Sequence, residues 1–323
     1  MCYSPVVRPD RSEKLQGILF VNIATLSWAT NIILGRHLRD EIGPLALTAG
    51  RYIVSAIVFA LLLSRAPKQE RRVGNDLLPL IAMAATGIVL FAPMLYFGLR
   101  FTTAINSTLI NGTGPLLTAL FAAWLIHEPY TRRQLAGALV AVAGVAVLIT
   151  GTSPEPGAAL GLNPGDVIVL AAAAVWGLYS VAGRRATRQR SPLSATAIST
   201  YMGLPVLVAA ALVEQYTIPV VYSPRLALIT VYLGVVPAAL GFSMWNAGVK
   251  KLGAGGAMVF YNTLPLYGAL LGYLLLGERL SVAHGAGGVL IIAGGLYSAL
   301  ARARSSRSSR YRRSSGSEVP DSP

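Results

Sequence analysis

The chain contains the same apolar segment twice, and this duplication constrains its fold more than any other feature. Residues 114–145 and 264–295 align without a gap, and the segments that precede them match as well. The corresponding pairs include Trp28 and Trp176, Pro115 and Pro265, Glu128 and Glu278, and Gly144 and Gly294. A duplicated apolar chain is typical of an internally symmetric membrane protein.

The composition is that of a protein surrounded by lipid. Of 323 residues, 54% are hydrophobic and 12% are charged, whereas an ordinary soluble domain has about 25% charged residues. The mean hydropathy is +0.58, and apolar runs of about 20 residues, the length that crosses a bilayer core as a helix, recur along the sequence. A soluble protein could not bury so many of these runs. The sequence therefore predicts an all-α integral membrane protein.

The apolar runs predict ten transmembrane helices in two sets of five. Their connections are short, which leaves no room for a soluble domain, and the single cysteine, Cys2, excludes an internal disulfide and a cysteine-based metal site. The first repeat covers 17–151 and the second 164–301, flanked by an N-terminal segment, 1–16, and a polar tail, 302–323, that we expect to be disordered. The predicted spans are 17–35, 44–64, 77–99, 104–126, 133–151, 164–183, 194–213, 226–249, 254–276 and 283–301.

The excess of basic residues orients the chain and does not require nucleic acid as a partner. When successive connections are assigned to alternate sides, 21 of the 27 Lys and Arg residues fall on the side of the termini and 5 on the other side. This asymmetry is the positive-inside pattern. We therefore expect an inner-membrane protein with both termini in the cytoplasm and with the arginines of the tail on anionic lipid headgroups.

The odd number of spans in each repeat has a geometric consequence. The second repeat must enter the membrane from the side opposite to the first, so the repeats are expected to be inverted and related by a pseudo-twofold axis in the membrane plane. In proteins of this design the substrate site lies near the midplane, between the halves, and is exposed to each side in turn.

The matched segments resemble the EamA repeat of the drug/metabolite transporter superfamily. The shared features are the series of proline, apolar run, glutamate and glycines at 115–144 and 265–294, a tryptophan in the first span of each half, and Arg51 in the second span. The resemblance covers essentially all of residues 17–301. Within the family the chain looks most like the YddG-type exporters of aromatic and other amino acids. This resemblance implies an exporter of amino acids or similar small polar metabolites that works by alternating access.

Acidic side chains are missing from the middle of every predicted span. All thirteen Asp and Glu residues lie in a connection, a tail or the last turn of a span, and the three histidines are also at span ends. A proton-coupled exporter of cations normally keeps a carboxylate deep in its bundle. We therefore expect transport that is uncoupled, or only weakly coupled, to protons.

The charged residues of the spans have competing interpretations. Glu128 and Glu278 would face opposite sides of the membrane in an inverted repeat, so we expect them to tie helix ends to their connections rather than to contact substrate. Arg51 lies well inside the second span. A charge at that depth is costly and often functional, but an arginine can also snorkel to the interface or pair with helix-end carbonyls. A structural or gating role is expected ahead of direct carboxylate binding.

The fourth and ninth spans are interrupted at matching places. A proline removes a backbone N–H and frees a carbonyl one turn earlier, and interruptions at corresponding positions of two repeats indicate a transporter site. The freed carbonyls could hold the ammonium of a zwitterion while side-chain amides contact its carboxylate; alternatively, the amides only join helices. The residues concerned are Asn106, Asn111 and Pro115 in the first repeat and Tyr261, Asn262 and Pro265 in the second.

Aromatic residues complete the predicted pocket. Trp28 and Trp176 occupy corresponding deep positions and are expected to form a wall or gate, and Asn31 lies one turn from Trp28. Tyr and Trp nearer to span ends are equally compatible with the aromatic belt of the membrane interface. The remaining candidates are Tyr96, Tyr179, Trp245 and Asn246.

The sequence thus predicts a transporter and not an enzyme. Zinc-protease and serine-hydrolase motifs are missing, and no cofactor or metal is expected. The expected partners are a small-molecule substrate and membrane lipid. Glycines at seven-residue spacing in 137–144 and 287–294 predict helix-packing seams, within the chain or in a homodimer that is not required. The alternatives are an EamA-type transporter of another metabolite or drug and, from another class, a membrane-embedded enzyme or sensor.

Overall fold

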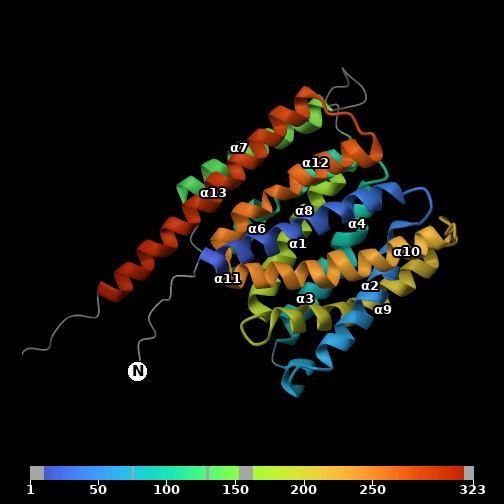
Figure 1. Ribbon diagram of the computed structural model, residues 1–323, viewed down its shortest axis with the longest axis horizontal. Coiled ribbons are helices and arrows are strands. Elements are labelled where there is room, and N and C mark those ends of the chain that lie inside the picture. Colours follow the sequence, from blue (N-terminus) through green and yellow to red (C-terminus); the bar gives the residue numbers. More distant parts are fainter. Residues whose placement is uncertain (1–10, 75, 129–130, 153–162, 316–323) are drawn as a thin grey trace, which may run out of the picture.

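Helices account for every regular element in the computed structural model, which describes residues 11–74, 76–128, 131–152 and 163–315 (Figure 1). Five helices that begin after a connection or a break have a proline at their first or second position, where the missing N–H costs no intrahelical hydrogen bond. Within the described residues there is no β-strand. The chain is therefore all-α, as the apolar runs predict.

The two halves present similar series of elements. The first half consists of α1 (Arg11–His37), α2 (Pro44–Leu63), the 3-10 helix η1 (Lys68–Arg71), α3 (Leu77–Met83), the π-helix η2 (Ala84–Phe91), α4 (Ala92–Gly98), α5 (Ala104–Asn111), α6 (Gly114–Ile126) and α7 (Arg132–Gly151). The second half consists of α8 (Pro164–Ala186), α9 (Pro192–Glu214), α10 (Pro224–Leu233), the π-helix η3 (Gly234–Leu240), α11 (Gly241–Tyr261), α12 (Thr263–Leu276) and α13 (Val282–Ser315). In the described residues, η1 and a separate helix like α5 occur only in the first half.

Each half contains a π-helical segment in its third long helix. The segment η2 joins α3 to α4, and η3 joins α10 to α11. A proline accompanies each: Pro93 is the second residue after η2, and Pro237 lies inside η3. Because proline donates no backbone hydrogen bond, the ordinary helical ladder is interrupted there. Such π segments are rare and occur frequently at functional sites.

Eight helical stretches of the described chain are long and apolar enough to cross a membrane, and Thr263–Leu276 and Val282–Ser298 are apolar but shorter. One predicted boundary is wrong. Residues 250–253, expected to separate the eighth and ninth spans, lie within α11, which continues without a break to the predicted interruption of the ninth span at Asn262. The sequence Lys-Lys-Leu at 250–252 consists of good helix formers, so the helix does not stop there.

The last helix is longer than the final predicted span. α13 continues as far as Ser315, into the segment 302–323 for which the sequence predicts disorder. The six arginines and Ala303 of that segment favour a helix, and no glycine or proline interrupts it before Gly316. Residues 316–323 lie outside the described residues.

The final helices of the two halves, α7 and α13, lie side by side (Figure 1). Their contact uses the repeated glycines. A Cβ atom added at Gly144 would lie 2.7 Å from the carbonyl oxygen of Gly287, and one added at Gly287 would lie 2.8 Å from that of Gly144. Gly137 meets Gly294 in the same way, at 2.6 Å. The predicted packing seam therefore lies within the chain and is reciprocal between the halves.

The two repeated glutamates make a second reciprocal pair of contacts. Arg36 at the end of α1 lies 4.0 Å from the Glu278 carboxylate, and the corresponding Arg184 at the end of α8 lies 2.8 Å from that of Glu128. Each arginine thus pairs with the glutamate of the other half. The Glu278 carboxylate also accepts hydrogen bonds from the first two backbone N–H groups of α5, at 2.8 and 2.9 Å. It thereby satisfies donors that a helix N-terminus leaves free.

Candidate functional site

A cavity of about 60 Å³ lies between the two halves. It is small beside the roughly 300–1,000 Å³ of ordinary ligand pockets, so the helices are drawn in around it in this conformation. Both halves contribute to its wall. The lining residues are Trp28, Asn31, Ile32, Arg51, Tyr52, Phe91, Leu95, Asn111, Trp176, Pro237, Phe242, Tyr261 and Leu264.

Arg51 reaches this cavity from the middle of α2. Its Nη1 donates to Asn31 Oδ1 and to the Tyr96 hydroxyl, each at 2.7 Å, and that hydroxyl donates to Asn31 Oδ1, also at 2.7 Å. The guanidinium carbon lies 4.8 Å from the centre of the Tyr52 ring, within the range of a cation–π contact. The arginine is only 6% exposed, so its charge is held inside the protein.

The charge of Arg51 has no acidic partner in the part of the chain that the structure describes. None of the ion pairs there includes Arg51, and its buried Nε makes no hydrogen bond with the described residues. A buried charge without a counter-charge is costly. Arg51 is thus the group that sets the electrostatics of the cavity.

Aromatic rings from both halves surround the rest of the cavity. The Trp28 ring centre lies 5.7 Å from that of Phe242 and 6.1 Å from that of Tyr261. On the other side, Trp176 lies 4.8 Å from Phe91 and 6.1 Å from Phe242. These distances are those of favourable aromatic pairs. Phe242 therefore connects the two corresponding tryptophans, which line the cavity together.

The two helix interruptions also meet the cavity. α5 ends at Asn111 and α6 begins at Gly114, while α11 ends at Tyr261 and α12 begins at Thr263. Pro115 and Pro265 cannot donate to the carbonyls of Asn111 and Tyr261, four residues earlier. Both Asn111 and Tyr261 line the cavity. A pair of broken helices, one from each half, thus lines the same cavity as Arg51.

Three predicted residues form a layer behind the lining. Tyr96 holds Arg51, as described above. Tyr179 packs on Trp176 with ring centres 4.9 Å apart, and Trp245 packs on Trp28 at 5.4 Å. These residues support the wall rather than forming its surface.

Three predicted amides lie away from the cavity. Asn246 lines a separate space of about 230 Å³ next to the start of α9. Asn262 faces α13, because a Cβ atom at Gly295 would lie 2.8 Å from its Oδ1. Asn106 donates to Asp166 Oδ2 at 3.0 Å and to the Thr152 hydroxyl at 2.9 Å. Of the five predicted amides, Asn31 and Asn111 are in the lining of the cavity.

Asp166 lies at a span end, as the sequence indicates, but it is fully buried. It is in the first turn of α8 and accepts hydrogen bonds from Thr102 and Asn106. A carboxylate at a helix N-terminus is stabilised by the helix dipole. The group joins α8 to the connection between α4 and α5, and it is not among the residues that line the cavity.

Sequence reasoning missed Phe91, Phe242 and Pro237, all of which line the cavity. They lie in or next to the π segments η2 and η3. A π segment shifts the helical register, so a count in steps of 3.6 residues does not predict which face these residues occupy. The prolines near the middle of the third and eighth spans were the available signal.

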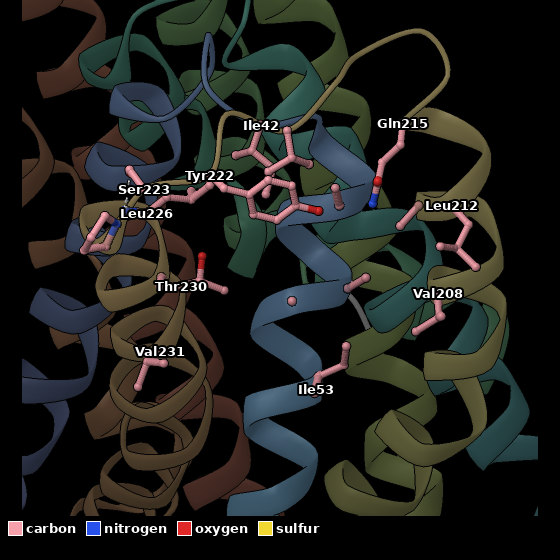
Figure 2. A pocket seen from close by; sticks show the side chains of 17 residues that line it. Ile42, Ile53, Val208, Leu212, Gln215, Tyr222, Ser223, Leu226, Thr230 and Val231 are labelled. Atoms are coloured by element: carbon pink, nitrogen blue, oxygen red, sulfur yellow. Dashed lines mark hydrogen bonds between the residues drawn. The ribbon is translucent and has the colours of Figure 1, made fainter.

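A larger concavity of about 810 Å³ lies between α2, α9 and α10. Figure 2 shows Ile53, Val208, Leu212 and Val231 around it and the ring of Tyr222 across one end. No charged side chain lines it. Because it offers little to orient a small polar metabolite, its size does not make it the better site.

Within the described residues there is no group of three or more His, Cys, Asp or Glu side chains that could hold a metal ion. The candidate site therefore consists of one cation, hydrogen-bonding groups and aromatic rings. Such a set can recognise a small organic molecule with an anionic group.

These features define a multi-pass helical membrane protein built from two similar repeats that share a central cavity. The EamA-like transporter family matches residues 15–150 and again residues 163–299. The chain therefore belongs to this family of the drug/metabolite transporter superfamily, and each match coincides with one of the two halves.

Relatives cover most of the chain. A probable terminal-alkyne amino-acid exporter of Streptantibioticus cattleyicolor is 29% identical over 84% of this chain and 89% of its own length. The uncharacterized transporter YyaM of Bacillus subtilis is 28% identical over 81% of this chain and 86% of its own length. A protein of known crystal structure is 26% identical, with a TM-score of 0.63, over 89% of this chain and 98% of that one.

Proposed function

We propose that this transporter exports amino acids or similar small polar metabolites by alternating access. The observation that carries the proposal is the cavity between the repeats, with a buried cation on one side and broken helices and aromatic rings around it. The likeness to a probable amino-acid exporter supports the substrate class. Export of another metabolite or a drug is the alternative within the family, and a membrane-embedded enzyme or sensor is disfavoured.

We infer that the chain crosses the inner membrane ten times as two inverted repeats, with both termini in the cytoplasm. The distribution of basic residues supports this orientation: it is 21 against 5, and still 19 against 5 when Lys250 and Lys251, which lie within α11, are left out. The reciprocal contacts of Gly144 with Gly287, and of each arginine with the glutamate of the other half, support a twofold relation between the repeats. In that arrangement the central cavity lies near the midplane.

Alternating access then requires contacts between the repeats to open on one side at a time. On the cytoplasmic side Arg190 donates to Asp76, with Nη2 at 2.6 Å from Oδ1, and on the outer side Arg225 donates to Glu41. Each pair joins the two halves. Rocking of the repeats around the cavity would break one pair while the other stays closed.

We propose that this movement is uncoupled or only weakly coupled to protons. The support is that the described cavity lining contains no carboxylate or histidine. Asp166, a buried carboxylate, is held by neutral donors elsewhere, at the start of α8.

Counterflow in proteoliposomes tests the proposal. Vesicles with purified protein are loaded with one unlabelled amino acid at a time, and entry of the labelled form is compared with that into protein-free vesicles. We expect severalfold faster entry for at least one amino acid, and little change when a pH gradient is imposed. If no amino acid moves, the substrate class is wrong; if the rate follows the pH gradient strongly, the uncoupled mechanism is wrong.

A further inference from the structure

We propose that Arg51 is the carboxylate anchor of the central site, so that the substrates are carboxylates with an apolar or aromatic body. This deepens the proposed function and rests on it for the identity of the site. The sequence alone favours a structural or gating arginine, and the contacts in the structure change that balance.

The first step is that Arg51 neither snorkels to the membrane interface nor stabilises a helix end. A snorkelling arginine would expose its guanidinium, but Arg51 is 6% exposed. An arginine that stabilises a helix end would donate to backbone carbonyls. Its hydrogen bonds among the described residues go to the side chains of Asn31 and Tyr96. The positive charge is therefore kept at the cavity and is not used to terminate a helix.

The second step is the free edge of the guanidinium. Asn31 and Tyr96 both engage Nη1 and so fix the plane of the group, whereas Nε has no hydrogen-bond partner in the described chain. A carboxylate binds arginine through two parallel hydrogen bonds. The edge that carries Nε is available for this geometry once the contracted cavity expands. A bound carboxylate would also supply the missing counter-charge.

The third step concerns the rest of the ligand. Besides Arg51, the cavity is lined by uncharged groups. These include the rings of Trp28, Trp176 and Phe242, together with Asn111 and Tyr261 at the helix breaks. Aromatic faces accept apolar side chains and attract ammonium groups. The carbonyls of residues 111 and 261 receive no hydrogen bond from the prolines four residues later, because proline has no N–H. A zwitterion with a hydrophobic side chain satisfies all these groups, but only its carboxylate requires Arg51.

The test uses three probes of similar shape on the purified full-length protein: L-phenylalanine, 3-phenylpropionate, which lacks the ammonium, and 2-phenylethylamine, which lacks the carboxylate. Binding is followed by tryptophan fluorescence, because Trp28, Trp176 and Trp245 surround the site. The variants are Arg51→Gln and Arg51→Lys. Arg133→Gln removes an exposed arginine of α7 and serves as the control.

We expect Arg51→Gln to weaken both carboxylate probes by about ten- to hundredfold and to leave 2-phenylethylamine unchanged. Arg133→Gln should bind all three as the wild type does. Arg51→Lys keeps a charge in the core but loses the paired hydrogen bonds, so it should weaken the binding of the carboxylate probes less than Arg51→Gln does. The lysine variant is used in place of Arg51→Gln if the glutamine variant does not fold. The proposal is overturned if the carboxylates bind the variants with wild-type affinity, if all three probes weaken equally, or if neither carboxylate binds the wild type.

The two proposals fail separately. If no amino acid is transported but 3-phenylpropionate binds in an Arg51-dependent way, export of amino acids is wrong and the anchor stands. If Arg51→Gln transports amino acids at the wild-type rate, the anchor is wrong and the export function stands.

Discussion

The two repeats agree in the contacts that hold them together and differ in the charged and amide side chains that they present to the cavity. Glycines, helix breaks and the glutamates at helix ends recur at corresponding positions. Arg51 of α2, by contrast, corresponds to Ser199 of α9, and Asn31 of α1 corresponds to Tyr179 of α8. The cavity therefore receives its charge from the first repeat alone. A symmetric scaffold can rock between two similar states while an asymmetric site binds its ligand in one orientation.

The inter-repeat ion pairs show the same contrast in another form. Asp76 at the start of α3 pairs with Arg190, which precedes α9, and Glu41, which precedes α2, pairs with Arg225 at the start of α10, so the charges are exchanged. In the Asp76–Arg190 pair the side chains are 1% and 5% exposed, whereas in the other pair Arg225 is 59% and Glu41 is 20% exposed. The two contacts are thus similar in their place in the fold but not in burial, and the Asp76–Arg190 contact is the more buried one.

The largest expected loss of stability comes from breaking the buried Asp76–Arg190 ion pair. Asp76→Asn leaves Arg190 buried without its carboxylate and should cost about 3 kcal/mol of unfolding free energy. Glu41→Gln, the matched change in the exposed pair, should cost at most about 1 kcal/mol. Unfolding titrations in mixed micelles measure both. Equal losses would contradict the difference in burial.

The same pair gives a pH dependence with a definite sign. Hydrogen bonds from Arg190 lower the pKa of Asp76. A carboxyl group whose pKa is lower in the folded than in the unfolded state stabilises the fold. This contribution is complete above the pKa of the unfolded state, about 3.9, and is lost as the pH falls through the lower pKa of the folded state. The difference between wild type and Asp76→Asn should therefore stay constant near neutral pH and shrink below about pH 4. A difference that grows on acidification would contradict this origin.

The glycine seam should give a smaller and symmetric effect. Gly144→Ala and Gly287→Ala each place a methyl group against backbone of the opposite helix, at 2.7 and 2.8 Å, and each should cost about 2 kcal/mol because the helices must move apart. Gly285→Ala on α13 is the control, since a Cβ atom there meets nothing within 4 Å. If the seam is reciprocal, the double variant costs less than the sum. Unequal single losses would show that the halves do not share the contact evenly.

The sequence predicted the scaffold better than the site for physical reasons. Apolar length predicts helices directly, and the duplication predicts which helices correspond. Whether an amide faces the cavity depends on helix rotation: Asn31 and Asn111 do, while Asn106 turns to Asp166. Rotation is set by packing and by the π segments, which shift the register before Phe91 and Phe242. The free edge of Arg51 could not be predicted, because it depends on which donors from other helices reach the guanidinium.

The smallest effect separates the two corresponding tryptophans. Trp28 Nε1 donates to the carbonyl of Pro237 in η3 at 3.1 Å, which ties α1 to a π segment of the other half. The indole N–H of Trp176 makes no hydrogen bond with the residues that the structure describes. Trp28→Phe and Trp176→Phe remove the same atoms from aromatic walls, so the difference between them isolates this bond. We expect Trp28→Phe to be less stable than Trp176→Phe by about 1 kcal/mol, measured in the same unfolding titration. Equal stabilities would mean that the π segment is held by ring packing alone, and the contrast between the repeats would then be confined to the cavity charge.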